Sequence, residues 1–133
     1  MQPCKFGVIA VTETWANEHN ESLLTIPGYH GLFTNRIDRW GGGVALFIDD
    51  SLSYSERNDI NVFAGDEFES YFIELDEVNI GNKLIDVIYH PPGKEFDKFQ
   101  NNLDNLLAVI SKNKRNCILT GDFNLDLLKS DTH

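Results

Sequence analysis

The segment CILTGDFN, residues 117–124, decides how this chain folds. Its first four residues suit a buried strand, and a glycine then leads into two polar residues that flank a phenylalanine. Side chains two positions apart in an extended segment point the same way, so Asp122 and Asn124 share one face while Phe123 points into the core. The segment therefore predicts a strand whose end presents a carboxylate and an amide together.

Two earlier strand-like runs end in the same manner. Residues 6–12 (FGVIAVT) read as a strand buried on both faces and are followed by Glu13, while LIDVI at 84–88 is followed by Tyr89. Loops at strand ends often assemble a site, because the sheet fixes the spacing of the side chains that they project. We therefore expect Glu13, Tyr89 and the Asp122–Asn124 pair to meet.

The remaining segments predict further strands. The connection 14–27 carries one helical turn at most, and the three glycines 41–43 make a tight bend. A turn within 79–82 joins two strands into a hairpin, which ends where proline can no longer donate to a ladder. The additional strands are expected at 29–34, 44–48, 68–75, 84–89 and 117–120.

One amphipathic helix is predicted before the last strand. Its apolar face repeats at helical spacing and consists of Phe96, Phe99, Leu103, Leu106, Leu107 and Ile110. Basic residues follow the last turn, where they complement the carboxyl end of a helix: Lys112, Lys114 and Arg115.

Length and composition predict a single domain over residues 1–133. The chain is 41% hydrophobic and 24% charged, which supplies a sizeable core and excludes collagen-like, disulfide-rich and wholly disordered proteins. The net charge of −10 argues at first against a nucleic-acid partner. Ten acids and one base between 49 and 77 carry most of it, so we expect a solvated acidic edge there and other faces able to meet DNA.

The sequence also predicts a location inside the cell. No apolar run approaches the roughly 18 residues that a membrane helix needs, and the first residues lack the pattern of a signal peptide. Cys4 and Cys117 are read as two reduced thiols. We expect no contact with a membrane.

The residues at the strand ends suit metal-assisted chemistry on phosphate. Glu13 and Asp122 offer hard carboxylate oxygens, which Mg²⁺ prefers, and Asn124 can orient a water while Tyr89 donates to a phosphate. Taken singly, each has a simpler explanation: Glu13 as a solvated strand end, Tyr89 as an amphipathic core edge, and the other two as turn formers. The inference depends on their occurring together.

Together the motifs resemble the endonuclease/exonuclease/phosphatase superfamily. The closest resemblance is to the endonuclease domains of non-LTR (LINE-type) retrotransposons, which precede a reverse transcriptase. The order and spacing of the segments both fit this family. The matching segments, beside the amphipathic helix, are VIAVTETW (8–15), IPGY (26–29), RWGGGVALFI (39–48), VIYHPPG (87–93) and ILTGDFNLDLL (118–128).

The resemblance implies an α/β fold, a two-sheet β-sandwich flanked by helices. It implies Mg²⁺-dependent nicking of DNA, with Mn²⁺ as a possible substitute, and a nuclear location. Glu13 matches the metal-binding glutamate, Tyr89 the tyrosine that contacts the scissile phosphate, and Asp122 and Asn124 the pair that positions the attacking water. Asp122 is also expected to bind the metal.

Other residues are candidates for contacts with nucleic acid. Where relatives often have arginine after the tyrosine, this chain has His90, which we expect at the surface and able to contact phosphate. Arg36, Arg39 and Trp40 are the concentration of basic and aromatic residues near the expected site, and they suit either backbone phosphate or a solvated loop.

Parts of the family pattern are not found in these residues. The resemblance implies an earlier strand with a catalytic asparagine and a later Ser-Asp-His, so we interpret the chain as a partial domain truncated at both ends. Such a cut sandwich predicts an apolar face, an unpaired edge and self-association. Two alternatives stay open: an inactive remnant or interaction module of the same fold, and an abasic-site nuclease or phosphoesterase cousin.

Overall fold

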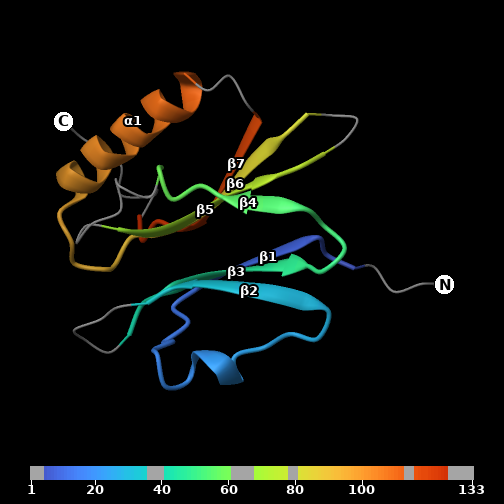
Figure 1. Ribbon diagram of the computed structural model, residues 1–133. Helices are drawn as coiled ribbons and strands as arrows, with labels where there is room; N and C mark the ends of the chain where they lie inside the picture. Colours follow the sequence, from blue (N-terminus) through green and yellow to red (C-terminus); the bar gives the residue numbers. More distant parts are fainter. Residues whose placement is uncertain (1–4, 36–40, 61–67, 78–80, 113–115, 126–133) are drawn as a thin grey trace.

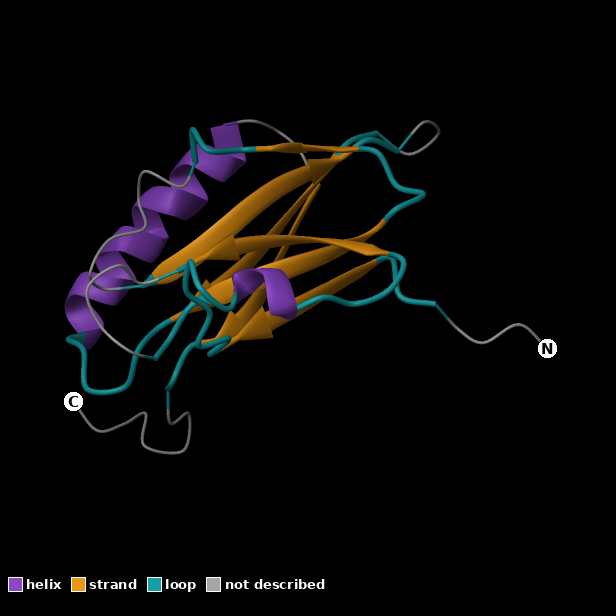
Figure 2. Cartoon of the chain, turned by 60° about the horizontal axis from the view of Figure 1, so that its bottom comes forward, coloured by secondary structure: helices purple, strands orange, loops and turns teal. Residues whose placement is uncertain are grey.

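The computed structural model describes residues 5–35, 41–60, 68–77, 81–112 and 116–125. In this part of the chain two β-sheets pack face to face, and one long helix lies on the outer side of the second sheet (Figure 1). The chain thus has the predicted α/β sandwich. A 3-10 turn, η1 (Glu21–Leu23), lies on the other side of the strands from the helix (Figure 2).

The first sheet has three antiparallel strands in the order β1-β3-β2. They are β1 (Val8–Thr12), β2 (Tyr29–Thr34) and β3 (Val44–Asp49). The central strand, β3, is buried along its whole length, which its apolar sequence VALFI explains.

The second sheet has four strands in the order β4-β5-β6-β7. They are β4 (Tyr54–Glu56), β5 (Glu69–Leu75), β6 (Lys83–Tyr89) and β7 (Asn116–Asp122). The predicted hairpin is confirmed as the antiparallel pair β5–β6, whereas the short edge strand β4 was not predicted. Strands β6 and β7 are parallel, and α1 (Phe96–Lys112) forms the crossover between them.

Two apolar clusters hold these layers together. The inter-sheet core lies between the two sheets and consists of Leu32, Val44, Leu46, Ile48, Tyr71, Ile73, Leu75, Ile85, Val87 and Tyr89. The helix-side core lies between the second sheet and α1 and consists of Ile60, Phe68, Phe72, Leu84, Ile88, Phe99, Leu106 and Ile110. Strand β6 contributes alternate residues to both clusters, as the period of two along a strand requires.

The buried face of α1 is narrower than the sequence predicts. Phe99, Leu106 and Ile110 are buried, and Leu103 packs against the same cluster. Phe96 and Leu107 are instead exposed, because they lie at the margins of the helical stripe, outside the contact with the sheet. Lys112 is the final residue of the last turn rather than the first residue after it, while residues 113–115 lie outside the described residues.

Strands β1 and β7 are only half-buried, so the prediction of fully buried strands at both places is wrong. Each lies at the edge of its sheet among the described strands, and Ile118 of β7 is 49% exposed. Their apolar sequences reflect one buried face rather than two. The expected self-association stays a prediction.

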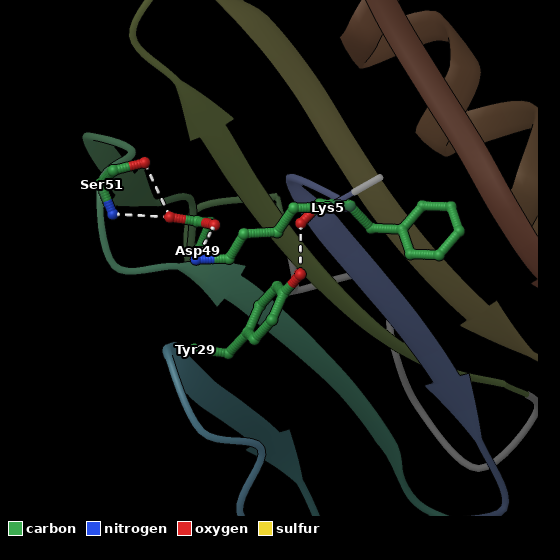
Figure 3. Close-up of polar contacts among 5 residues, drawn as sticks. Lys5, Tyr29, Asp49 and Ser51 are labelled. Carbon is green, nitrogen blue, oxygen red and sulfur yellow. Dashed lines mark hydrogen bonds and ion pairs between the residues drawn. The ribbon is translucent and has the colours of Figure 1, made fainter. Parts of the chain in front are cut away.

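The prediction that the acidic segment 49–77 forms a solvated edge is only partly confirmed, because some of its acids are buried. Asp49 is buried and pairs with Lys5 at 2.7 Å, while Ser51 donates to it from both its amide and its hydroxyl (Figure 3). These contacts lower the pKa of Asp49 to about 2, the hydrogen bond from Lys5 being the largest cause. Glu74 is also buried and lies 3.6 Å from Arg57. Two acids of the segment therefore anchor structure.

The same contacts anchor the residues that precede β1. The Tyr29 hydroxyl donates to the carbonyl oxygen of Phe6, and the Lys5 ammonium lies 5.5 Å from the centre of the Tyr29 ring (Figure 3). The start of β1 is thereby joined to both other strands of its sheet.

Asp86 is a carboxyl side chain that lies beside the helix-side core. It is 0% exposed, and along β6 it shares its face with Leu84 and Ile88. Neither carboxyl oxygen has a hydrogen-bond partner of normal geometry among the described residues. Desolvation raises the pKa of Asp86 to about 9, and the backbone amides of Tyr71 and Val87 offset only part of this effect.

We expect Asp86→Asn to remove a pH dependence of stability. The folded chain holds the Asp86 proton up to about pH 9, whereas the unfolded chain releases it near the ordinary value of 3.8. Stability therefore falls as the pH rises between these values, by up to about 1.4 kcal/mol per pH unit. Urea denaturation at pH 5, 6.5 and 8 measures this slope. The exposed helix variant Asp104→Asn should keep the slope, and an unchanged slope in Asp86→Asn would contradict the assignment.

Candidate active site

Three strand ends meet at one end of the sandwich. Glu13 directly follows β1, Tyr89 is the last residue of β6, and Asp122 is the last residue of β7. The predicted convergence requires contact between two sheets, because β1 belongs to the first sheet whereas β6 and β7 belong to the second.

Tyr89 is the centre of this arrangement. Its ring lies in the inter-sheet core, and its hydroxyl donates to Glu13 Oε1 at 2.8 Å across the gap between the sheets. In the parallel ladder Tyr89 is the register partner of Asp122, and register partners present their side chains on the same face. Glu13 thus contacts the phenol from the first sheet, and Asp122 lies beside Tyr89 in the register of the second sheet.

The turn after β7 has the predicted alternation. Phe123 packs against the helix-side core, while Asp122 and Asn124 are exposed. The Asn124 backbone amide donates to Asp122 Oδ1 at 3.0 Å, and the side-chain Nδ2 of Asn124 donates to the His90 carbonyl at 2.6 Å. Asn124 has φ 46°, a left-handed conformation that asparagine tolerates better than most residues. Both polar residues are therefore held in place by hydrogen bonds.

Two of the three glycines, Gly42 and Gly43, hold the segment that carries Glu13. The amides of Thr14 and Trp15 donate to the carbonyls of Gly43 and Gly42 at 3.3 and 2.9 Å. Glu13 and Trp15 have φ 53° and 54°, which costs side-chain-bearing residues on the order of 1–3 kcal/mol each. Such strain persists only where neighbouring contacts determine the conformation, and it clusters at functional sites.

Glu69 is a residue of this site that the sequence analysis missed. It begins β5, pairs in register with Tyr89, and its Oε2 accepts the Gly43 amide at 2.7 Å. Glu69 thus connects the glycine turn of the first sheet to the second sheet. An acid at the start of a strand is an ordinary feature, and only the register with Tyr89 reveals its position.

His90 is buried, so the expectation that it is a surface residue is wrong, and its contact with phosphate stays a prediction. It is 3% exposed, and its ring stacks on Phe99 of α1 with the ring centres 4.3 Å apart. The ring is covered because β6 passes directly into the loop beneath the start of the helix. Arg36, Arg39 and Trp40 lie outside the described residues.

The donors present fit a hard divalent cation held by few protein ligands. Glu13 and Asp122 are both exposed carboxylates, and each has one oxygen engaged in a hydrogen bond from its neighbour. No cluster of three or more acidic, histidine or cysteine side chains suitable for a metal occurs among the residues that the structure describes. Mg²⁺ usually binds through one or two carboxylates and keeps several waters, which this pair can provide.

The opposite end of the sandwich holds a cavity of about 360 Å³. Its lining includes Val8, Leu52, Leu75, Ile85 and Ile118, which are mainly apolar, and none of the predicted site residues. The polar chemistry and this cavity are therefore separate features. None of the described helices is long and apolar enough to cross a membrane.

We expect Gly43→Ala to destabilise the protein and to displace Glu13. A Cβ at Gly43 would lie 2.5 Å from Thr14 Oγ1, in a backbone of φ 86°. Gly81 has nearly the same φ, 87°, but nothing lies within 4 Å of its Cβ position, so Gly81→Ala is a matched control. Overpacking should lower the free energy of unfolding of Gly43→Ala by roughly 1–3 kcal/mol more than that of the control. If urea denaturation gave equal losses of unfolding free energy for Gly43→Ala and Gly81→Ala, the Thr14 side chain would be able to move aside freely, and the expectation would be wrong.

Comparison with known proteins places this site in context. The profile of the Endonuclease/Exonuclease/phosphatase family matches residues 4–133, nearly the whole chain. No curated protein matches the sequence. Enzymes of this family are generally hydrolases, typically use divalent metals, and have a nuclease or phosphoesterase type of function. The chain, with its two-sheet sandwich and the carboxylates at its strand ends, belongs to the Endonuclease/Exonuclease/phosphatase family.

Proposed function

We propose that the chain is the Mg²⁺-dependent DNA endonuclease of a non-LTR retrotransposon, which nicks target DNA to prime reverse transcription. The observation that carries the proposal is the contact between Tyr89 and Glu13, with Asp122 in register beside Tyr89. Three segments far apart in the sequence bring two carboxylates and a phenol together at an exposed edge. Such a set suits a phosphodiester whose charge a cation helps to neutralise.

Glu13 and Asp122 would hold the Mg²⁺, or Mn²⁺ in its place. When bound, the ion acts as a Lewis acid toward the phosphate and stabilises charge that develops during hydrolysis. The carboxylates are suited to this because each has one oriented oxygen. The Tyr89 hydroxyl orients Glu13 Oε1, and the Asn124 backbone amide orients Asp122 Oδ1. Orientation before binding reduces the entropy that the site loses when a ligand arrives.

Tyr89 has two successive tasks in this proposal. Its hydroxyl has a single proton, which it donates to Glu13 in the structure. Donation to a phosphate oxygen competes with that bond, so the proton must turn from Glu13 to the substrate as the substrate binds. Tyr89 would thus orient the carboxylate in the free protein and contact the phosphate in the complex.

Asn124 would position the attacking water. Its Nδ2 is engaged with the His90 carbonyl, which leaves the side-chain oxygen to accept a hydrogen bond from water. Asp122, two residues earlier, lies beside it through the Asn124 amide and provides a negative charge near the same place. The pair can therefore orient a water next to the scissile phosphate.

The choice of DNA as the partner rests on the order of the motifs. The segments TETW, IPGY, RWGGGVALFI and GDFN follow one another as in the retroelement branch of the family. The same resemblance supports a reverse transcriptase domain in the complete element and a nuclear place of action. Trp15, 56% exposed two residues from Glu13, offers an aromatic surface suited to a nucleic-acid substrate.

We expect the purified chain to nick supercoiled plasmid with Mg²⁺ and to lose this activity with a chelator. Asp122→Asn removes a charge with little change in shape, and the nicking rate should fall on the order of 10²-fold. Asp97→Asn, on the exposed start of α1, is the matched control and should nick like the wild type. Gel separation of nicked from supercoiled plasmid gives the rates.

Four other results would contradict parts of the proposal. A folded chain that never nicks DNA is the inactive remnant of the same fold. Cleavage confined to a duplex with an abasic site indicates an abasic-site nuclease, and hydrolysis of small phosphate esters alone indicates a phosphoesterase. Equal nicking by Asp122→Asn would exclude this site as the source of the activity.

Metal binding tests the same carboxylates without any substrate. Glu13→Gln keeps the shape of the side chain and removes its charge, so its affinity for Mn²⁺ should fall by about 10-fold or more, as followed by electron paramagnetic resonance. Glu18→Gln, in the exposed loop after β1, should bind Mn²⁺ like the wild type. Equal affinities of the two variants would remove Glu13 from the metal site.

A further inference from the structure

His90 makes three hydrogen bonds to three consecutive residues of the candidate site. Its backbone amide donates to the Asp122 carbonyl at 2.9 Å, and its ring Nδ1 lies 2.9 Å from the Phe123 carbonyl oxygen. Its own carbonyl accepts Asn124 Nδ2 at 2.6 Å. The whole turn from Asp122 to Asn124 is therefore attached to one residue.

Only one of these three bonds depends on the histidine side chain. Any residue except proline could supply the backbone amide, and every residue has the carbonyl. The bond from Nδ1 requires a side-chain donor at the position of that nitrogen, because the Phe123 carbonyl can only accept. The proton is accordingly on Nδ1, and Nε2 is bare in the neutral ring.

The surroundings of the ring support this tautomer. His90 Nε2 is buried and has no hydrogen-bond partner among the described residues, so no acceptor is available there for a proton. The ring stacks on Phe99 with an interplanar angle of 26°, and Phe123 lies against the same Phe99 with ring centres 6.1 Å apart. Helix α1 thus fixes the plane of the imidazole, and the imidazole directs Nδ1 toward the turn.

We infer that His90 is a positioning residue: through Nδ1–H and the Phe123 carbonyl it sets the conformation of the Asp122–Asn124 turn. Phe123 lies between the two polar residues, so fixing its carbonyl limits the rotation of the peptide that leads into Asn124. That residue has the uncommon φ of 46°, which needs such support. The inference rests on the proposed hydrolase site but concerns how the site is held.

Two substitutions separate the hydrogen bond from the packing. Asparagine presents a side-chain N–H near the position of Nδ1 but no ring, whereas phenylalanine keeps the stack on Phe99 and has no donor. His90→Asn should therefore keep the turn, and His90→Phe should loosen it. His30→Phe, on the exposed side of β2, is the matched control for the change from histidine to phenylalanine.

The readout is amide hydrogen exchange of Asn124 in the metal-free chain, because this amide donates to Asp122 Oδ1 within the turn. Relative to amides of β3, exchange at Asn124 should accelerate roughly 3- to 10-fold in His90→Phe and change less than about 2-fold in His90→Asn and in the control. Long-range ¹H–¹⁵N NMR of the wild type should show the proton on Nδ1. Faster exchange of the Asn124 amide in His90→Asn than in His90→Phe would overturn the inference. So would a wild-type proton on Nε2.

Turnover gives a second comparison. With Mg²⁺ and supercoiled plasmid, His90→Phe should lower the kcat of nicking on the order of 10- to 100-fold with KM nearly unchanged, since misplacing the turn affects the reaction more than the binding. A wild-type chain that does not nick the plasmid would refute the proposed function, while the exchange rates and the tautomer would still decide the role of His90. The two failures are therefore distinguishable.

Discussion

The parallel pairing of β6 with β7 is the constraint on which the rest of the molecule depends. Two parallel strands cannot be joined by a tight turn, so α1 must cross over the sheet, and its apolar stripe then covers the outer face as the helix-side core. The same register sets Tyr89 beside Asp122. A slip of one residue would turn the polar end of β7 toward the opposite face and would separate the site.

The two ends of the sandwich are closed in different ways. At the site, side-chain hydrogen bonds connect the sheets: Thr34 Oγ1 to the Ser70 carbonyl at 3.1 Å, the Gly43 amide to Glu69, and Tyr89 to Glu13. The Tyr89 contact, together with the hydrogen bonds from the Thr14 and Trp15 amides to Gly43 and Gly42, holds Glu13 and Trp15 in left-handed conformations that apolar packing alone would not specify. The opposite end is lined by apolar side chains around a cavity. The polar contacts of Lys5, Tyr29 and Asp49 at that end lie within the first sheet, whereas those at the site connect the two sheets.

The negative charge is distributed by structural role. Asp49 and Glu74 are buried and paired with basic residues, whereas Asp86 is buried in an apolar layer. Desolvation, and to a smaller extent the charge of Asp86, raises the pKa of Cys117 to about 11. Cys117 is accordingly a free thiol of low reactivity. Glu13 and Asp122 are the exposed carboxylates of the strand ends. An exposed carboxylate pair can attract a cation, which buried and paired acids cannot do as readily.

The sequence by itself determined the order of the elements and predicted most of the candidate site. Alternating and helical periodicities predicted β2, β3, the β5–β6 hairpin and α1, and the polar residues after three strand runs predicted Glu13, Tyr89 and the Asp122–Asn124 turn, because those signals are local. Which strands lie at sheet edges, where Asp86 is buried, how Glu69 reaches the glycine turn and why His90 is covered depend on contacts between distant segments. Only the tertiary structure decided them, since composition and spacing contain no information about which neighbour excludes water from a side chain.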